Sequence, residues 1–486
     1  MTAIREGANM EAFFTLVDNI SGFIWGGSWG EAQLLPVPPM VVVLLGTGLY
    51  FMVRLGGRPL RRLGPAFGQL WRGRGAQEGQ GEISPWNALS TALSGQVGTG
   101  NLAGVATAIT LGGPGAIFWM WITALFGMAA AFAESSLAVK FREKHPAGHV
   151  HGGPMYYIKN ALGPKWTWLA VFFCVGALFS ALATGNTIQA NSVANAMVQA
   201  VPGLPNWGAG LIVAGFVFLV IIGGIKSIGA IAGKVVPAMA LFYMVCAITV
   251  LALHADQIPA AFGTIFTYAF GLEEAAGGIA GYGVLQAVRF GVARGLFSNE
   301  AGQGSTAIAH AAAQTDDPVR QGEIAMLGTF IDTIVICTMT ALAILVVDGS
   351  FGAEGATYAW QASDLAGVQV TSAAFSEGLP FGSVIIASVL ALFAFTTILG
   401  WAYYAETALT YLVGDRWAVP FRYVWVVVVF FGALQPIDFV WRMGDIANAA
   451  MAFPNLIAIL ALSGVVIAMA KDAAAKLKAA KPQIAE

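Results

Sequence analysis

Charged side chains are scarce in this sequence. Asp, Glu, Lys and Arg make up 10% of its 486 residues, whereas 57% of the residues are hydrophobic. A water-soluble protein of this length carries about a quarter charged residues, because its surface must face water. The net charge is −2 and no concentrated block of Lys and Arg occurs, so nothing indicates nucleic acid as a partner. Most of the surface must face a different medium, and we expect the lipid bilayer.

Cysteine and recognisable catalytic motifs are scarce too. The three cysteines (Cys174, Cys246 and Cys337) lie inside apolar runs, where small buried side chains are expected rather than a disulfide or a metal site. The sequence has no tetrahedral metal motif, nucleophile elbow or nucleotide-binding loop. We therefore expect a protein that is not an enzyme and that draws its energy from a gradient rather than from ATP.

Apolar runs long enough to cross a bilayer recur along the whole chain. They predict an all-α membrane protein with about eleven transmembrane helices. The expected spans are 37–55, 87–110, 114–140, 166–199, 207–225, 229–253, 280–310, 323–347, 380–412, 421–437 and 445–470.

The distribution of Lys and Arg predicts how these spans are oriented, because basic residues are retained on the cytoplasmic side. If the spans alternate, the basic linker 56–86 and the tail 471–486 fall on one side, together with most other basic residues. The charged residues on the other side are mostly acidic. We expect the cell (plasma or inner) membrane, with the N-terminal segment 1–36 outside and the tail in the cytoplasm.

Without the extra first helix at 37–55, ten spans remain, and they divide into two groups of five at 87–253 and 280–470, joined by an outer loop at 254–279. The opening helix of each group is interrupted by glycine and polar residues, at 94–101 and at 294–305. An odd number of spans per group turns the second group upside down. Paired interrupted helices in two such halves are the best sequence indication of a transporter's binding site.

An interruption exposes backbone groups that hydrocarbon cannot satisfy, so it persists only where it lines a cavity or binds something. The amides that begin the second half-helix suit a carboxylate, and the freed carbonyls suit a small cation. Close packing of small residues is one alternative, but it would not need the Asn, Gln and Glu found here. A dinucleotide fingerprint also matches 98–103, but it requires a preceding β-strand, and both flanks are predicted to be membrane helix.

At these residues the chain resembles a known family, the alanine or glycine:cation symporters (sodium:alanine symporters) of the amino acid–polyamine–organocation superfamily. The stretches that carry the resemblance are 87–106, 112–121, 152–157, 297–302 and 396–401. The resemblance extends over nearly the whole chain after Arg54. It implies a leucine-transporter-like 5+5 inverted repeat with one extra N-terminal helix, Na⁺ or less often H⁺ as the coupled ion, and alanine or glycine as the substrate.

The resemblance also implies roles for individual residues. The amides of Thr99 and Gly100 would hold the substrate carboxylate. The further residues implied in substrate binding are Asn101, Gln189, Phe297 and Trp401, of which Trp401 would limit the substrate side chain to about a methyl group. The implied sodium ligands are carbonyl groups near Ser94 and Val97 and the hydroxyls of Thr396 and Thr397.

Three charged residues lie within expected spans in the second half of the chain. Arg294 and Glu300 flank the interruption, and Asp332 lies deep within a later span. Isolated charges at that depth are costly, so we expect Arg294 to form a structural pair with Glu300 or Asp332.

These observations favour a sodium-coupled symporter that imports small neutral amino acids by alternating access. A proton-coupled or uncoupled amino-acid carrier of the same fold is the alternative. From other classes, an ion channel and a membrane-embedded enzyme stay open, although Ser298 beside Glu300 is the only candidate for a nucleophile and a base.

Overall fold

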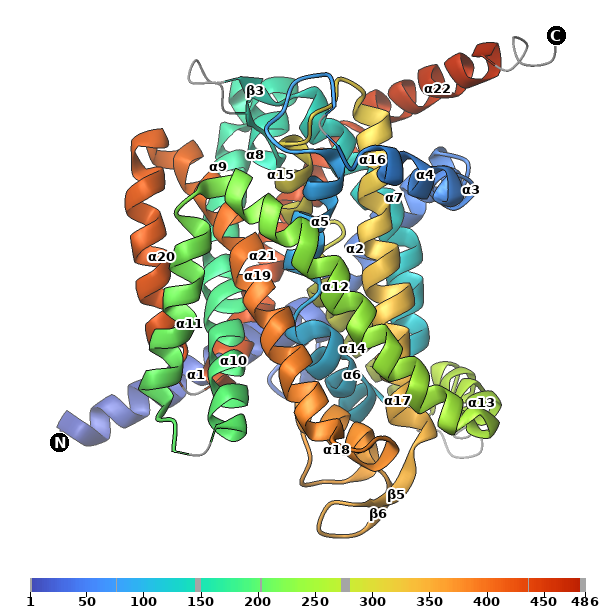
Figure 1. The fold of residues 1–486 in the computed structure, drawn as a ribbon, viewed down its shortest axis with the longest axis vertical. Coiled ribbons are helices and arrows are strands. Elements are labelled where there is room, and N and C mark those ends of the chain that lie inside the picture. Colours follow the sequence, from blue (N-terminus) through green and yellow to red (C-terminus); the bar gives the residue numbers. More distant parts are fainter. Residues whose placement is uncertain are drawn as a thin grey trace.

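The computed structural model describes residues 2–75, 77–144, 150–201, 203–271, 280–435 and 437–480, and within them it is overwhelmingly helical (Figure 1). The elements up to the first interruption are α1 (Thr2–Gly26), β1 (Ser28–Trp29), β2 (Ala32–Gln33), α2 (Pro39–Arg54), α3 (Arg58–Arg61), α4 (Leu63–Arg72) and α5 (Pro85–Gln96). The next group is η1 (Gly100–Gly104, a π-helical segment), α6 (Val105–Gly112), α7 (Ala116–Lys140), β3 (Glu143–Lys144), β4 (Val150–His151), α8 (Pro154–Tyr157), η2 (Ile158–Leu162), η3 (Pro164–Trp166), α9 (Thr167–Ser180), η4 (Ala181–Thr187), α10 (Ile188–Ala200), α11 (Asn206–Ile221), α12 (Gly224–Leu253), η5 (Ala255–Gln257) and α13 (Ile258–Ala269).

The second half of the chain begins with the other interrupted helix. Its elements are α14 (Ala280–Asn299), α15 (Ser305–Ala311), α16 (Pro318–Thr329), η6 (Phe330–Cys337), α17 (Thr338–Val346), β5 (Asp348–Phe351), β6 (Ala356–Tyr358), η7 (Ala359–Gln361), α18 (Val368–Gly378), α19 (Gly382–Val413), η8 (Asp415–Trp417), α20 (Ala418–Gly432), α21 (Ile437–Ala461) and α22 (Ser463–Ala480). The three short sheets are antiparallel hairpins that pair β1 with β2, β3 with β4, and β5 with β6.

The sequence marks helix starts chemically. The hydroxyl of Ser84 accepts a hydrogen bond from the amide of Asn87, and Pro85 occupies the first turn of α5. The carboxylate of Asp317 likewise accepts from the first amides of α16, whose first residue is Pro318. Such caps satisfy amides that have no helical partner, and proline costs nothing in a first turn. The helices α5 and α16 therefore begin where the sequence dictates.

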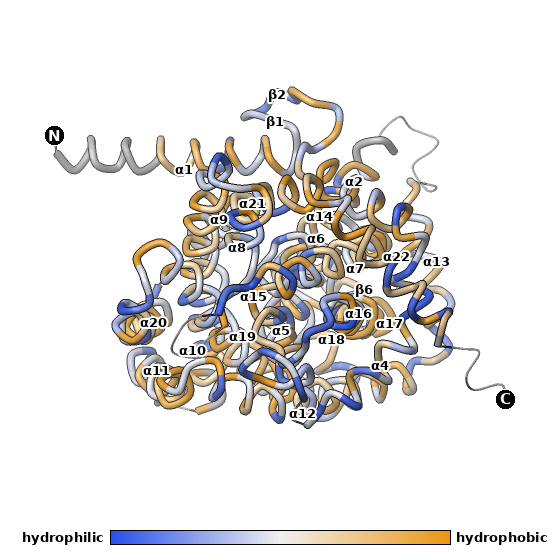
Figure 2. Tube along the Cα trace, turned by 90° about the horizontal axis from the view of Figure 1, so that it is seen from above, coloured by the Kyte–Doolittle hydropathy of each residue, from blue (hydrophilic) through white to orange (hydrophobic). Residues whose placement is uncertain are grey.

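The two interrupted helices run in opposite directions. In Figure 1, α5 lies nearer the top of the bundle than its continuation α6, whereas α14 lies nearer the bottom than its continuation α15. Seen along the bundle axis in Figure 2, α5, α6, α15 and α19 lie towards the middle, and α11, α13 and α20 lie at the periphery. The interruptions are therefore central, shielded by the other helices.

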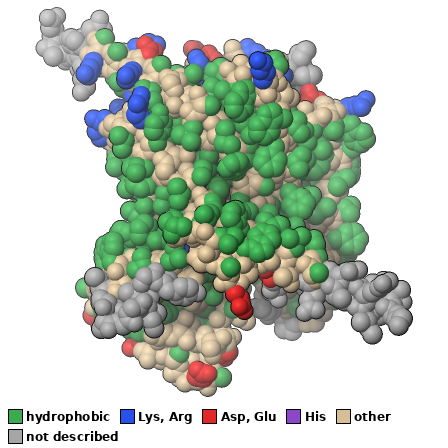
Figure 3. All heavy atoms as spheres, turned by 180° about the vertical axis from the view of Figure 1, so that it is seen from behind, with side chains coloured by type: hydrophobic (Ala, Val, Ile, Leu, Met, Phe, Trp, Pro, Cys, Tyr) green, Lys and Arg blue, Asp and Glu red, His purple; other side chains and the backbone are tan. Residues whose placement is uncertain are grey.

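The exterior matches a protein embedded in a bilayer. Within the described residues, six helices are long and apolar enough to span a membrane: Ala116–Lys140, Pro164–Val198, Gly224–Leu253, Pro318–Val346, Gly382–Val413 and Met443–Ala461. Pro39–Arg54, Gly100–Gly112 and Asn206–Ile221 are shorter apolar helices. On the face shown in Figure 3, hydrophobic side chains form a broad band; Lys and Arg gather at one end, and Asp and Glu occur at both ends.

Three segments differ from the expected organisation. The expected outer loop at 254–279 contains the helix α13, because its apolar face packs against α7, with Phe262 close to Trp121 and Phe266 close to Phe118; residues 272–279 lie outside the described part. The N-terminal segment contains the helix α1. The expected last span, 445–470, is divided between α21 and α22, and α22 runs into the tail as far as Ala480.

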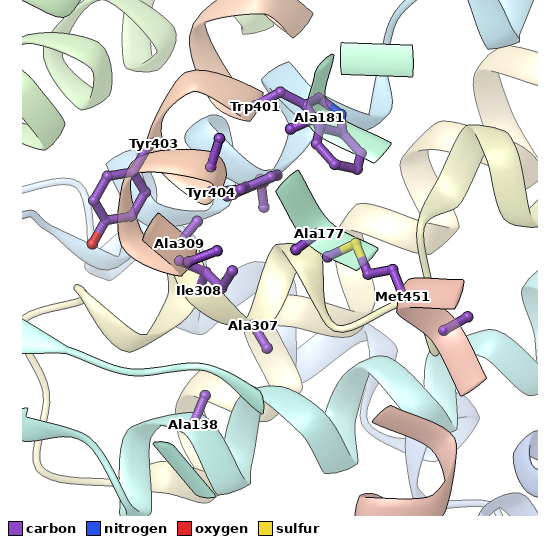
Figure 4. Packing of buried hydrophobic residues seen from close by; sticks show 14 of the residues in the cluster. Ala138, Ala177, Ala181, Ala307, Ile308, Ala309, Trp401, Tyr403, Tyr404 and Met451 are labelled. Atoms are coloured by element: carbon purple, nitrogen blue, oxygen red, sulfur yellow. The ribbon is translucent and has the colours of Figure 1, made fainter. Parts of the chain in front are cut away.

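The core around the second interrupted helix is built from small residues. Figure 4 shows Ala307, Ile308 and Ala309 of α15 between Tyr404 of α19 and Ala138 of α7. Small side chains let helices approach closely where lipid offers no hydrophobic force to drive them together. This close packing fixes the position of α15 beside the interruption.

Candidate functional site

The first interruption begins at Val97. Its amide makes the last regular bond of α5, to the carbonyl of Leu93 at 2.7 Å, and its ψ of 92° turns the chain out of the helix. The next amide, that of Gly98, donates to Oδ1 of Asn101 at 2.8 Å. In a continuous helix it would donate to the carbonyl of Ser94. The side chain of Asn101 thus takes the place of a helical carbonyl, and the carbonyl of Ser94 loses its helical partner.

Gln189 of α10 satisfies the following residue. The amide of Thr99 donates to Oε1 of Gln189 at 3.3 Å, and Nε2 of Gln189 donates to the hydroxyl of Thr99 at 3.0 Å and to the carbonyl of Thr184 at 3.0 Å. Gln189 is 2% exposed. A buried amide that makes these bonds is held in one orientation, so its position against Thr99 is well defined.

The two threonines of α19 differ in orientation. The hydroxyl of Thr397 lies 3.3 Å from the carbonyl oxygen of Val97 and 3.0 Å from that of Phe393. The hydroxyl of Thr396 also lies 3.0 Å from the carbonyl of Phe393, but it faces Sδ of Met239 at 3.5 Å. Both hydroxyls therefore converge on the carbonyl of Phe393, which the sequence analysis did not single out, and only Thr397 contacts the interruption in this conformation.

The second interruption is opened by three residues in the left-handed region. Glu300, Gly302 and Gly304 have φ values of 56°, 85° and 84°. Glycine adopts such angles without strain, but a residue with a side chain seldom does. A strained residue inside a buried site is a common mark of function. The carboxylate of Glu300 accepts a hydrogen bond from the hydroxyl of Ser305, and Trp401 is a second polar neighbour.

The two interruptions touch each other. Nε2 of Gln96 donates to the carbonyl of Asn299, the last residue of α14. A methyl group on Gly95 would lie 3.3 Å from Oε1 of Glu300, and one on Gly100 would lie 3.0 Å from the ring of Phe297. The glycines of the first interruption therefore allow the second to approach closely.

A small cavity lies between the interruptions. It has about 10 Å³ available to the centre of a water-sized sphere, which is room for about one water molecule. Of the residues expected to bind substrate or ion, those that line it are Gly100, Gln189, Phe297, Trp401 and Thr397. Glu300 also lines it and is the one charged residue among the described lining residues.

Trp401 limits the cavity from one side. A methyl group on Gly185 of η4 would lie 2.3 Å from Cγ of Trp401, so the indole packs directly on the backbone of η4. Figure 4 shows Trp401 beside Ala181 of the same segment. Any larger side chain at residue 185 would displace the indole.

The expected pairing of Arg294 with Glu300 or Asp332 is corrected by the structure. Nη2 of Arg294 lies 2.8 Å from Oδ2 of Asp445 in α21. Arg294 lies within α14, whereas Glu300 follows the last residue of that helix and has a φ of 56°, so the chain has left the helix before it reaches Glu300. The partner, Asp445, was missed although it also lies inside an expected span, because sequence spacing does not reveal which helices face each other.

Asp332 has a different set of neighbours. Its carboxylate accepts from the hydroxyl of Ser298 at 2.9 Å, that of Thr333 at 2.7 Å and Nδ2 of Asn101 at 2.6 Å. Asn101 therefore links the first interruption to η6. It does not line the cavity, so in this conformation its side chain is not placed to contact the substrate directly.

One end of the pair of interrupted helices is tied together by backbone bonds. Residues 80–83, before α5, form a bridge with residues 312–315, after α15, through Ile83 and Ala313. Arg142, at the end of α7, donates to the carbonyls of Gln80, Ala311, Ala313 and Thr315. Burial lowers the pKa of Arg142, and the charge of Asp316 opposes that shift. This end of the site is thus closed by a guanidinium that bridges both halves of the chain.

Comparison with known proteins places these features in a family. The model of the sodium:alanine symporter family matches residues 24–486. The sodium/alanine symporter AgcS of Methanococcus maripaludis is 43% identical over 468 residues, which covers 94% of this chain and 97% of AgcS. The putative sodium/proton-dependent alanine carrier protein YrbD of Bacillus subtilis is 38% identical over 446 residues, covering 89% of each chain.

A solved structure shares the fold at much lower identity. MhsT, in complex with L-phenylalanine, superposes with a TM-score of 0.55 at 14% identity, covering 82% of this chain and 93% of MhsT. This likeness confirms a helical membrane fold of the leucine-transporter type.

Proposed function

The chain belongs to the sodium:alanine symporter family, and we propose that it imports alanine and other small neutral amino acids such as glycine together with Na⁺. The family consists of symporters, which decides against the enzyme and the channel. One observation carries the proposal. The hydroxyl of Thr397 lies 3.3 Å from the carbonyl oxygen of Val97, and the cavity beside this contact is lined by Gly98 and Gly100 of the same interruption.

The proposed ion site is made of oxygen atoms on two helices. The carbonyls of Ser94, Val97 and Phe393 and the hydroxyls of Thr396 and Thr397 would surround the ion. Oxygen-only donors are what a hard cation requires. Thr396 must rotate away from Met239 to contribute, because its hydroxyl now faces that sulfur at 3.5 Å. Sodium binding would then join α5 to α19 and favour the conformation in which both helices supply oxygen ligands to the ion.

The proposed substrate site uses the other side of the interruption. The amides of Thr99 and Gly100, at the start of the second half-helix, would receive the carboxylate, since amides there attract anions. The amide of Thr99 now donates to Gln189, so Gln189 would yield this bond and donate its own amide to the substrate. The carboxylate of Glu300, which lines the cavity, would receive the ammonium group, whose positive charge would favour the ionised form of the carboxylate.

The size of the substrate follows from the walls. Phe297 and Trp401 confine a space that holds about one water molecule, so even alanine requires them to move. A tryptophan anchored against Gly185 restricts how far the pocket can widen. We therefore propose alanine and glycine rather than larger amino acids, with binding coupled to a rocking of the helices that opens the site to one side at a time.

We also propose the topology expected from the sequence. About eleven spans, with the N-terminus outside and the C-terminus in the cytoplasm, place the Lys- and Arg-rich end in the cytoplasm, as retention of basic residues demands. The gathering of those residues at one end supports this orientation.

The test is uptake of labelled alanine by purified protein in proteoliposomes. An inward sodium gradient should drive accumulation above equilibrium, and a proton gradient without sodium should not. Accumulation that follows the proton gradient and does not depend on sodium would show that the coupled ion is H⁺ rather than Na⁺. Equilibration that no gradient drives beyond the outside concentration would indicate an uncoupled carrier.

A further inference from the structure

A large cavity lies at the Lys- and Arg-rich end, far from the substrate site. Its volume is about 880 Å³, it is open on one side, and most of its lining residues come from four parts of the chain. These are the helices α3 and α4, the end of α7, the first turns of α16 with the residues before them, and α22. Nothing in the transport mechanism above uses this cavity.

Of the four acidic residues of the cavity, two are paired with basic side chains and two accept from backbone amides. Glu323, which is 1% exposed, accepts from Arg58 at 2.7 Å, from Arg62 at 3.0 Å and from Gln69 at 2.8 Å. Asp317 caps α16, and Asp472 pairs with Lys476 at 2.8 Å. The amide of Gln80 donates to Asp316 at 3.2 Å.

In the described part of the chain, three basic residues of the cavity form no ion pair, and in total six basic and four acidic side chains line it. Arg72, Lys140 and Arg320 line it, and no carboxylate within the described residues lies within 4.0 Å of any of them. They come from α4, α7 and α16, so three separate elements direct positive charge at one space. Such an arrangement attracts an anion with more than one negative oxygen.

The exposed side chains of α3 and α4, two helices that line the cavity, indicate where it lies relative to the bilayer. On α3 and α4, Leu60, Phe67 and Trp71 are 46%, 39% and 60% exposed, and the guanidinium of Arg74 lies 3.3 Å from the centre of the Trp71 ring. Exposed apolar side chains interleaved with arginine are typical of a helix lying in the membrane interface. In Figure 1, α3, α4 and α22 extend sideways from the end of the bundle.

We propose that this cavity binds the headgroup of an anionic glycerophospholipid. The phosphate would contact Arg72, Lys140 and Arg320, and the acyl chains would lie beside Phe67 and Trp71. Arg58 connects this site to α22, because it pairs with Glu323 and its Nη1 also donates to the carbonyl oxygen of Ala470 at 3.0 Å. A bound lipid would therefore stabilise the attachment of α3, α4 and α22 to α16.

The experiment measures lipid binding to the full-length protein in detergent, by native mass spectrometry and by the thermal unfolding midpoint. The probes are phosphatidylglycerol, phosphatidylcholine and inorganic phosphate. We expect phosphatidylglycerol to raise the midpoint and to remain bound, whereas phosphatidylcholine and phosphate at the same concentration should have little effect. Each unpaired cation contributes about fivefold in affinity, so the triple variant R72Q/K140Q/R320Q should bind about a hundredfold more weakly.

The matched control removes the same charge elsewhere. Lys165, Lys234 and Arg416 are exposed and do not line the cavity, so K165Q/K234Q/R416Q should keep the effect of phosphatidylglycerol. Equal binding by the cavity variant and the control would overturn the proposal, and so would a full response to inorganic phosphate alone. If the triple variant does not fold, the three single variants must each weaken binding about fivefold, and unchanged binding in all three would overturn it equally.

Discussion

The hydroxyl of Thr397 lies 3.3 Å from the carbonyl oxygen of Val97, joining α19 to the first interrupted helix across the proposed ion site. Two segments separated by 300 residues in sequence thereby present oxygen atoms to one point. The arrangement leads to a prediction about sodium.

Thr397→Val keeps the shape of the side chain and removes the hydroxyl. A contact to a charged group contributes about 1.5–3 kcal/mol, so the sodium concentration for half-maximal alanine uptake should rise about tenfold or more. Thr397→Ser, which keeps the hydroxyl, should retain most of the sodium affinity. Thr396→Val should have a smaller effect, because that hydroxyl starts from a position facing Met239. Unchanged sodium dependence in Thr397→Val would remove Thr397 from the ion site.

Glu300 is predicted to recognise the substrate ammonium group. Glu300→Gln removes the carboxylate that would accept from the ammonium group but nearly preserves the shape, so KM for alanine should rise at least about tenfold. Propionate, which is alanine without its amino group, tests the assignment directly. It should compete poorly with alanine in the native protein, and the preference for alanine should shrink in the variant. Ser305→Ala, which removes a hydrogen-bond donor to Glu300 but no charge, is the control and should leave that preference intact. An unaltered preference in Glu300→Gln would contradict the assignment.

Gly185 is predicted to set the position of Trp401. In Gly185→Ala the new methyl group would lie 2.3 Å from Cγ of Trp401 and would displace the indole, at a cost of about 1–3 kcal/mol. Alanine uptake should fall strongly. Gly215→Ala is the matched control, because nothing lies within 4 Å of a methyl group there. Conversely, Trp401→Leu should admit larger amino acids, measured by competition with labelled alanine. Normal uptake by Gly185→Ala would show that the indole does not limit the pocket.

Arg294 and Asp445 are predicted to be energetically coupled. The two side chains are 9% and 21% exposed, so removing one leaves the other charge poorly solvated, at a cost of up to about 3–5 kcal/mol. Arg294→Gln and Asp445→Asn should each lower the thermal midpoint, and the double variant should recover part of the loss. The control is the double variant of Arg294→Gln and Asp332→Asn, in which the two single losses of thermal midpoint should simply add. Additive losses for Arg294 and Asp445 would mean that the contact contributes no coupling.

The helical class, the positions of both interruptions and the family could all be recognised in the sequence. Low charge and long apolar runs exclude a water-exposed surface, and a glycine-rich polar stretch inside such a run cannot remain regular helix in hydrocarbon without a reason. These are local properties of consecutive residues, so they need no knowledge of neighbouring helices. The helix α13 was missed for the complementary reason: it is short, and its apolar face is recognisable only once α7 lies beside it.

The tertiary structure decided which groups meet. Sequence spacing suggested that Arg294 pairs with Glu300 or Asp332, but the rotation of α14 about its axis turns Arg294 towards Asp445 and leaves Asp332 to Ser298, Thr333 and Asn101. The same holds for Thr396 and Thr397, which are adjacent in sequence yet point to different neighbours. Sequence determines that a helix is interrupted and which donors it carries. The directions in which those donors point depend on helix rotation and packing between segments hundreds of residues apart, and these are properties of the assembled bundle.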